Sequence, residues 1–196
     1  MMKKSKLSVY EMTLGSLFVA LMAIGANITA YLPFLQVMGV PLTLQTFFAI
    51  LAGLMLGSRL GSFSILVYVL LGLAGAPIFA GFKGGLSVVI APTFGFILSY
   101  IILAYFVGKI AESRRTMPRY IMAAATGIII NYIVGVHLFY LALNFWVGGD
   151  GISLALAWSS MVPFIIKDSV LAVGAALFTQ RFEKAWLSKT RLRQAA

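Results

Sequence analysis

The chain has 196 residues, of which 61% are hydrophobic and only 10% are charged. A soluble domain carries about 25% charged residues, so this composition excludes a soluble globular protein and predicts one integral membrane domain over residues 1–196. The chain has no cysteine, which excludes disulfides and thiol chemistry. The net charge of +10 has the sign that nucleic-acid binding needs, but its distribution favours another explanation.

Uninterrupted apolar runs, broken at proline, glycine and charged residues, predict six transmembrane helices rather than strands. The first run stays uncharged from Met12 to beyond Tyr31, so it is expected to be a span and not a cleaved signal peptide. The second and third runs are short and are separated by Gly57-Ser58-Arg59. The predicted spans cover about residues 12–31, 42–56, 61–74, 93–112, 119–145 and 156–182.

The basic residues predict the orientation of these spans. An even number of spans puts both termini on one side, and that side collects 13 of the 15 Lys and Arg residues. The other side has only Lys83, and Lys167 lies within the sixth span. Because cytoplasmic loops are enriched in Lys and Arg, both termini are expected in the cytoplasm. The positive charge thus reflects topology, and no nucleic-acid partner is expected.

Three loops rich in glycine or proline then face outward, at residues 32–41, 75–92 and 146–155. The middle loop is long for a simple connection and is expected to form a lid. For the first and third loops, a plain connecting role is an equal alternative. These extracellular loops would cap anything bound between the outer ends of the helices.

The polar residues of the spans collect at one depth. At about 1.5 Å per residue, Asp168, Asn131 and Asn27 lie roughly 20, 18 and 24 Å above the cytoplasmic edge. The hydrocarbon core is about 30 Å thick, so these side chains lie in its outer half. The sequence therefore predicts an all-α membrane protein with six transmembrane helices, cytoplasmic termini and a ligand pocket in the outer half.

The adjacent charges Lys167 and Asp168 are the principal candidates for this pocket. Charged side chains within a bilayer are costly unless they face the bundle interior or a cavity. Asp168 is assigned to a ligand or an ion in preference to a structural ion pair. Lys167 either lines the cavity or snorkels to its edge. Because neighbouring helical residues point about 100° apart, the two side chains are not expected to face one point.

Other candidates lie near the outward helix ends. The helix starts near Thr43 and Thr93 favour an anionic ligand group, although each threonine is equally suited to be a plain N-cap. Gln45 can both donate and accept hydrogen bonds. Asn131 suits a ligand or an interhelical hydrogen bond. Tyr100 suits stacking on a ligand or packing in the core.

No Walker A loop, metal-binding cluster or Gly-x-Ser-x-Gly motif is present in the sequence. This argues against a self-sufficient ATP-driven pump and against a hydrolase. Three functions remain: a small-molecule capture subunit, a stand-alone transporter or channel, and an intramembrane enzyme with Asp168 as its base. The enzyme would need a second catalytic group at the same depth, for which the sequence offers only amides and His137.

Motifs along nearly the whole chain resemble the biotin-transporter family BioY. They are Pro41-Leu42-Thr43-Leu44-Gln45-Thr46, Leu51-Ala52-Gly53, Leu56-Gly57-Ser58-Arg59-Leu60-Gly61, Gly75-Ala76-Pro77-Ile78-Phe79-Ala80-Gly81 with Gly84-Gly85-Leu86, Pro92-Thr93-Phe94-Gly95-Phe96, and Pro163-Phe164-Ile165-Ile166-Lys167-Asp168. The chain departs from the family pattern at Lys167, where the family often has glycine, and at Leu171, where it often has lysine.

The resemblance implies a substrate-binding (S) component of an energy-coupling-factor (ECF) transporter in a bacterial cell membrane. Such a subunit captures a vitamin at the outer face and is neither an enzyme nor dependent on a cofactor. The implied partners are a transmembrane coupling subunit and two cytoplasmic ATPases. On chemistry alone thiamin or riboflavin remain alternatives, and the family motifs select biotin.

The chemistry of biotin suggests roles for the candidates. Asp168 suits a ureido N–H group, and Asn131 or Gln45 suits the rest of the ureido ring. Lys83 or Lys167 suits the carboxylate. The expected apolar walls are Phe79, Phe82, Tyr100 and Trp146.

Contacts with the coupling partners are expected on the first span and the cytoplasmic loops. Ser16 and Ala20 form a small-xxx-small pair, which allows another helix to approach closely. Arg59, Arg114 and Arg115 are the candidate contacts at the cytoplasmic side.

Overall fold

The computed structural model describes residues 8–31, 36–37, 40–148 and 151–194. The described chain is mainly helical, as the apolar runs predict. Its elements are α1 (Val9–Asn27), η1 (Ile28–Tyr31), β1 (Gln36–Val37), β2 (Val40–Pro41), α2 (Gln45–Leu73), η2 (Leu86–Ile90), α3 (Phe94–Ala111), α4 (Met117–Phe145), α5 (Leu154–Ser160) and α6 (Val162–Gln194). The two-residue antiparallel strands were not predicted; they lie in a loop, outside the long helices.

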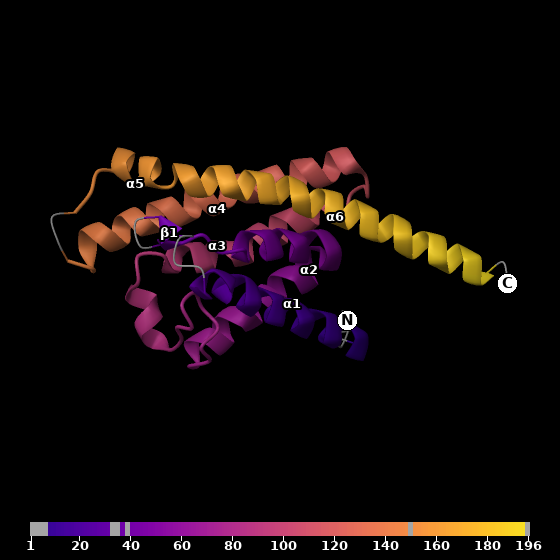
Figure 1. The fold of residues 1–196 in the computed structure, drawn as a ribbon, viewed down its shortest axis with the longest axis horizontal. Helices are drawn as coiled ribbons and strands as arrows, with labels where there is room; N and C mark the ends of the chain where they lie inside the picture. The colour runs from indigo at the N-terminus through magenta and orange to yellow at the C-terminus, as the bar shows by residue number, and fades with distance from the viewer. Residues whose placement is uncertain (1–7, 32–35, 38–39, 149–150, 195–196) are drawn as a thin grey trace, which may run out of the picture.

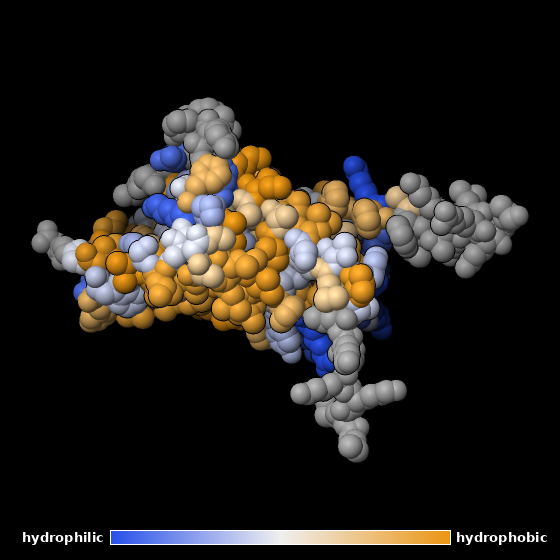
Figure 2. Space-filling view, turned by 90° about the horizontal axis from the view of Figure 1, so that it is seen from below, coloured by the Kyte–Doolittle hydropathy of each residue, from blue (hydrophilic) through white to orange (hydrophobic). Residues whose placement is uncertain are grey.

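Five of these helices are long and apolar enough to cross a membrane: α1, α2, α3, α4 and α6. Figure 2 shows a broad hydrophobic face across the middle of the molecule, with hydrophilic residues towards its ends. Such a face is stable against lipid and not against water. The chain is therefore a multi-pass membrane protein, which confirms the prediction from its composition.

The predicted second and third spans correspond to two arms of α2. The backbone of Gly57 has φ +81°, which interrupts the helix between residues 45–56 and 58–73. The amide of Gln45 donates to the Tyr68 hydroxyl at 3.0 Å, although these residues are 23 positions apart. In a straight helix that separation would be about 34 Å. The arms therefore fold back on each other, and at Gly61 an added Cβ would lie 2.8 Å from the Ala52 carbonyl oxygen.

A carboxylate holds the turn between the two arms. Oε1 of Glu112, at the C-terminal end of α3, accepts a hydrogen bond from the Ser58 backbone N–H at 2.7 Å. The Ser58 hydroxyl lies 3.0 and 3.1 Å from the two carboxylate oxygens. Because the first N–H groups of a helix lack intrahelical partners, Glu112 acts as a cap for the second arm.

The predicted sixth span differs from the structure at both of its ends. The structure divides it into the short helix α5 and the long helix α6, with Met161 between them. Pro163 is the second residue of α6, a position where its missing N–H costs little because the first turn has no acceptor for it. At the other end, α6 continues beyond the predicted boundary at Phe182 to Gln194.

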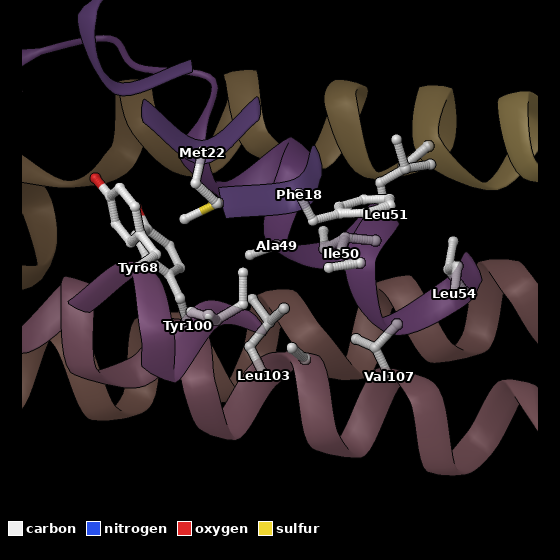
Figure 3. Packing of buried hydrophobic residues seen from close by; sticks show 14 of the residues in the cluster. Phe18, Met22, Ala49, Ile50, Leu51, Leu54, Tyr68, Tyr100, Leu103 and Val107 are labelled. Atoms are coloured by element: carbon white, nitrogen blue, oxygen red, sulfur yellow. The ribbon is translucent and has the colours of Figure 1, made fainter. Parts of the chain in front are cut away.

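The main hydrophobic core joins α1, α2 and α3 and also includes buried residues of α4 and α6. Figure 3 shows Tyr68 and Tyr100 together at one end of this core and Leu54 and Val107 at the other. Close packing depends on Gly53, where an added Cβ would lie 2.7 Å from the Ala104 carbonyl oxygen. A smaller cluster joins α4 to α5 and α6 and consists of Tyr132, Val136, Ala157, Met161 and Phe164.

The start of α1 and the end of α6 lie towards the same end of the elongated bundle, at the right of Figure 1. The strand pair and residues 74–92 lie towards the opposite end, which we name the loop end. This arrangement leaves the buried polar side chains of α2, α4 and α6 near the loop end.

Candidate functional site

A cavity of about 90 Å³ lies at the loop end, between α2, α3, α4 and α6. Most of the predicted ligand-binding residues meet there: Thr43, Gln45, Thr93, Tyr100, Asn131, Lys167 and Asp168. The remaining lining residues are Val40, Pro41, Thr46, Ala80, Phe96, Ile97, Tyr132, Met161 and Phe164. A mainly apolar wall with a few converging polar groups is typical of a site for a small molecule.

Asp168 is the centre of the polar part of this cavity and is only 3% exposed. Its Oδ2 accepts hydrogen bonds from the Thr46 hydroxyl at 2.9 Å and the Tyr132 hydroxyl at 2.8 Å. Its Oδ1 lies 2.8 Å from the Lys167 ammonium but receives no hydrogen bond of acceptable angle from the described residues. Oδ1 therefore keeps an acceptor position for a further donor.

The ion pair corrects the expectation that Lys167 and Asp168 cannot converge. The Cβ directions of neighbouring helical residues differ, but the long lysine stem lets the ammonium return to the carboxylate. The same ammonium donates a hydrogen bond to the Thr43 carbonyl, which ties α6 to the residues before α2. Because the pair is neutral overall, its burial costs less than that of either charge alone.

The amides of Asn131 and Gln45 form the other polar wall. Asn131 is 1% exposed, and its carbonyl oxygen accepts from the Ser99 hydroxyl at 2.6 Å. Its Nδ2 donates no hydrogen bond within the described ranges, so a donor is left for a ligand. Gln45 uses its Nε2 on Tyr68, and its carbonyl oxygen has no partner within the same ranges. The site therefore offers a donor and two acceptor positions.

Aromatic side chains form much of the apolar wall. Phe96 of α3 and Tyr132 of α4 pack edge to face with ring centroids 5.9 Å apart. Phe164 of α6 and Tyr100 of α3 lie on the same cavity. Tyr100 was predicted either to contact a ligand or to pack in the core. It is 5% exposed, lines the cavity and also belongs to the main hydrophobic core.

Four predicted residues do not line the cavity. Phe79 is 1% exposed and packs its ring against Tyr68 with centroids 5.4 Å apart. Lys83 is exposed and forms a backbone bridge to Phe79. Phe82 and Trp146 are each 49% exposed. The outer loop instead contributes Ala80 to the cavity.

Three polar residues of the hydrogen-bond network around the cavity were not predicted: Thr46 and Tyr132, which line it, and Ser99, which bonds Asn131. A signal was available, because buried polar groups almost always have hydrogen-bond partners. Asp168 and Asn131 therefore required donors at their own depth. Tyr132 directly follows Asn131, and Thr46 directly follows Gln45.

The predicted partner-contact residues lie on the surface of the bundle. Ser16 and Ala20 are exposed on α1, and Arg59 and Arg114 are exposed at the turns of the chain. Arg115 is also exposed, but its guanidinium lies 2.6 Å from Glu183 of α6. Because Ser16 and Ala20 are exposed, no described element covers this side of α1.

Comparisons with known proteins identify the family. The profile of the BioY family matches residues 1–188. The BioYB protein of Bacillus subtilis is 45% identical over 175 residues, which cover 88% of this chain and 86% of that protein. The biotin transporter BioY of Thermotoga maritima is 35% identical over 170 residues, which cover 87% and 94% of the two chains.

The fold also matches a solved structure. The crystal structure of the S-component for biotin from an ECF-type ABC transporter aligns with a TM-score of 0.76. The match covers 90% of this chain and 92% of that chain, at 21% sequence identity. The likeness to this structure is one of fold. The family assignment rests on the match of residues 1–188 to the BioY profile. This chain is a member of the BioY family.

Proposed function

We propose that this protein is the high-affinity biotin-capturing subunit of an ECF-type transporter and binds biotin in the cavity around Asp168. The main support is the buried carboxylate of Asp168 at this cavity, whose Oδ1 accepts no hydrogen bond from the described residues. The chain that carries it is related over most of its length to biotin transporters. A relative named for biotin does not by itself locate the site. The geometry of the donors and acceptors provides that argument.

The polar groups of the cavity match the ureido ring of biotin, which has two N–H groups and one carbonyl. Asp168 Oδ1 accepts from one N–H, and the Gln45 carbonyl accepts from the other. The Asn131 Nδ2 donates to the ureido carbonyl. A carboxylate acceptor strengthens such a bond because the bond is charge-assisted. The thioether ring packs against Phe96 and Phe164.

The carboxylate tail of biotin needs a cation or a set of N–H donors. Among the described residues, Lys167 is the basic side chain that lines the cavity. Thr93 precedes the start of α3, whose positive dipole end favours an anion, although the Phe94 and Phe96 N–H groups already donate to the Ala91 and Thr93 carbonyls. Lys83 lies outside the cavity on the outer loop, so it serves only if the loop moves inward.

Binding requires movement at the loop end. The cavity measures about 90 Å³, whereas sites for small molecules have about 300 Å³ or more. Because α2, α3, α4 and α6 are packed together, movement falls to the segments between the helices, of which Val40, Pro41 and Ala80 line the cavity. We infer that these segments open for biotin and close over it.

The topology that we propose has six crossings with both termini in the cytoplasm. The reversal of α2 at Gly57 supports two crossings within that element, and the common location of the start of α1 and the end of α6 supports an even number. The loop end then faces outward, where the vitamin is captured. The exposed Arg59 and Arg114 fall on the cytoplasmic side, as the positive-inside rule requires.

Transport requires partners in this proposal. The sequence has no ATP-binding motif, so hydrolysis belongs to two cytoplasmic ATPases that act through a transmembrane coupling subunit. The exposed Ser16 and Ala20 of α1 suit close contact with a helix of that subunit. A stand-alone transporter is the alternative, and uptake of biotin by vesicles that contain this chain alone would favour it.

Calorimetry of the purified full-length chain tests the function directly. Biotin is expected to bind with one site per chain, whereas thiamin and riboflavin give no heat of binding at the same concentrations. Absence of biotin binding by a folded, monodisperse sample would reject the proposal. Binding of another vitamin in place of biotin would reassign the substrate.

A further inference from the structure

A tight turn in the outer loop supplies Ala80 to the cavity. The backbone N–H of Phe79 donates to the Lys83 carbonyl at 3.0 Å, and that of Lys83 donates to the Phe79 carbonyl at 3.2 Å. Between them Gly81 and Phe82 have φ +74° and +55°. A positive φ is unfavourable for phenylalanine, so the conformation of this turn must be held by contacts outside it. We name residues 78–83 the Ala80 turn.

Asn27 binds the Ala80 turn on both sides of Ala80. Its Nδ2 donates to the Ile78 carbonyl at 3.3 Å and to the Ala23 carbonyl of its own helix at 3.0 Å. Its carbonyl oxygen accepts from the Phe82 backbone N–H at 2.7 Å. These bonds use both amide hydrogens, and the side chain is 7% exposed and does not line the cavity. Asn27 therefore has a role in the turn and not in ligand contact.

Tyr68 connects the same turn to the cavity wall. Its hydroxyl donates to the Ile78 carbonyl at 3.0 Å and accepts from the Gln45 Nε2 at 3.0 Å. A hydroxyl carries one hydrogen, so the two bonds have a defined direction, from Gln45 to Tyr68 to Ile78. Phe79 packs edge to face on the Tyr68 ring and covers this hydrogen-bond chain. Gln45 lines the cavity, whereas Tyr68 is fully buried outside it.

We infer that Tyr68 and Asn27 are positioning residues that hold the Ala80 turn over the cavity and couple its closure to the orientation of Gln45. The inference rests on the proposed function and deepens it. A ligand N–H that binds the Gln45 carbonyl fixes the amide, and the fixed amide orients the Tyr68 hydroxyl towards Ile78. Occupation of the cavity thus stabilises the closed turn, and the closed turn slows release of the ligand.

The absence of cysteine from the chain allows a direct measurement of this closure. Ala80→Cys introduces a unique thiol, and its reaction rate with a water-soluble maleimide reports how often the turn opens. Tyr68→Phe removes one hydroxyl without a change of shape, and Asn27→Ala removes the bonds on both sides of residue 80. Because a neutral hydrogen bond contributes about 0.5–1.5 kcal/mol, Tyr68→Phe is expected to raise the labelling rate about two- to tenfold. Asn27→Ala removes two bonds to the turn and is expected to raise it further.

Two control variants remove a tyrosine hydroxyl and an asparagine side chain at positions away from the Ala80 turn. Tyr105→Phe removes a hydroxyl from a tyrosine of α3 that is 42% exposed. Asn144→Ala removes a similar tether, since Asn144 bonds the Ile152 backbone at 3.1 and 3.3 Å in another loop. Neither residue lines the cavity, so in both variants the thiol introduced by Ala80→Cys is expected to react at the parent rate.

The dissociation rate of biotin provides the second readout. Tyr68→Phe is expected to release biotin about two- to tenfold faster than the parent, and Asn27→Ala faster still, in proportion to their labelling rates. Labelling is measured without biotin, so it tests the tethers even if the proposed function is wrong. A parent chain that does not bind biotin rejects that function. Unchanged labelling in a folded Tyr68→Phe variant rejects the tether, and faster labelling with unchanged release rejects the coupling.

Discussion

The substitution Asp168→Asn separates charge from shape at the centre of the site. Asparagine keeps the size of the side chain but replaces one acceptor oxygen with a donor. In the structure, three donors approach this carboxylate, from Thr46, Tyr132 and Lys167. If the amide oxygen serves Thr46 and Tyr132, the new NH₂ group faces the ammonium and the acceptor position for the ligand is lost.

The size of the effect follows from the lost charge-assisted bond. Hydrogen bonds to charged groups contribute about 1.5–3 kcal/mol, so the affinity for biotin is expected to fall about 10- to 150-fold. Removal of one partner of a buried ion pair also costs about 3–5 kcal/mol of folding stability. The Lys167 side chain is 22% exposed and can turn towards water, so the loss of stability is expected to lie below that range.

Calorimetry with biotin and thermal unfolding in the same detergent measure the two effects separately. The double variant Lys167→Met with Asp168→Asn removes the unpaired ammonium, and it is expected to recover stability without recovering affinity. Glu11→Gln is the control for affinity, because Glu11 belongs to the capping box of α1 and does not line the cavity. A folded Asp168→Asn variant with the parent affinity would refute the role of this carboxylate.

Three further substitutions test the site and the fold. Asn131→Ala is expected to reduce biotin affinity about two- to tenfold by calorimetry, since it removes a neutral hydrogen bond; equal affinity would remove Asn131 from the site. Glu112→Ala is expected to lower the free energy of unfolding by about 1–3 kcal/mol, because the Ser58 N–H loses its acceptor. Gly57→Ala is expected to destabilise the chain by at least about 1 kcal/mol, since φ is +81° there. Unchanged denaturation midpoints would contradict the last two.

The common level of Asp168 and Asn131 was predictable because a helix advances by a fixed rise per residue. Counting from charged residues at the helix ends places Asp168 and Asn131 at similar heights, and the structure brings both to one cavity. The helical class followed from the cost of unpaired backbone groups in lipid. Both arguments use properties of single helices and require no knowledge of how the helices pack.

Partners across helices were not predictable in the same way. Thr46 and Asp168 are 122 positions apart, and their hydrogen bond depends on the rotation of α2 and α6 about their axes. Packing sets that rotation, for example the close approach permitted by Gly53. The sequence therefore indicated a polar layer but left open which members touch. The pair of Lys167 and Asp168 was missed for another reason: the Cβ directions of neighbouring residues do not limit where a long lysine side chain can reach.

The outer loop shows a different limit, because its conformation depends on residues outside it. Its composition predicted a lid, and aromatic Phe79 and basic Lys83 were the obvious ligand contacts. In the structure the tethers from Asn27 and Tyr68 fix a turn that directs Phe79 into the core and Ala80 to the cavity. A small residue at that position leaves room for the ligand. Asn27 and Tyr68 bond the turn without lining the cavity, so their role cannot be inferred from ligand chemistry alone.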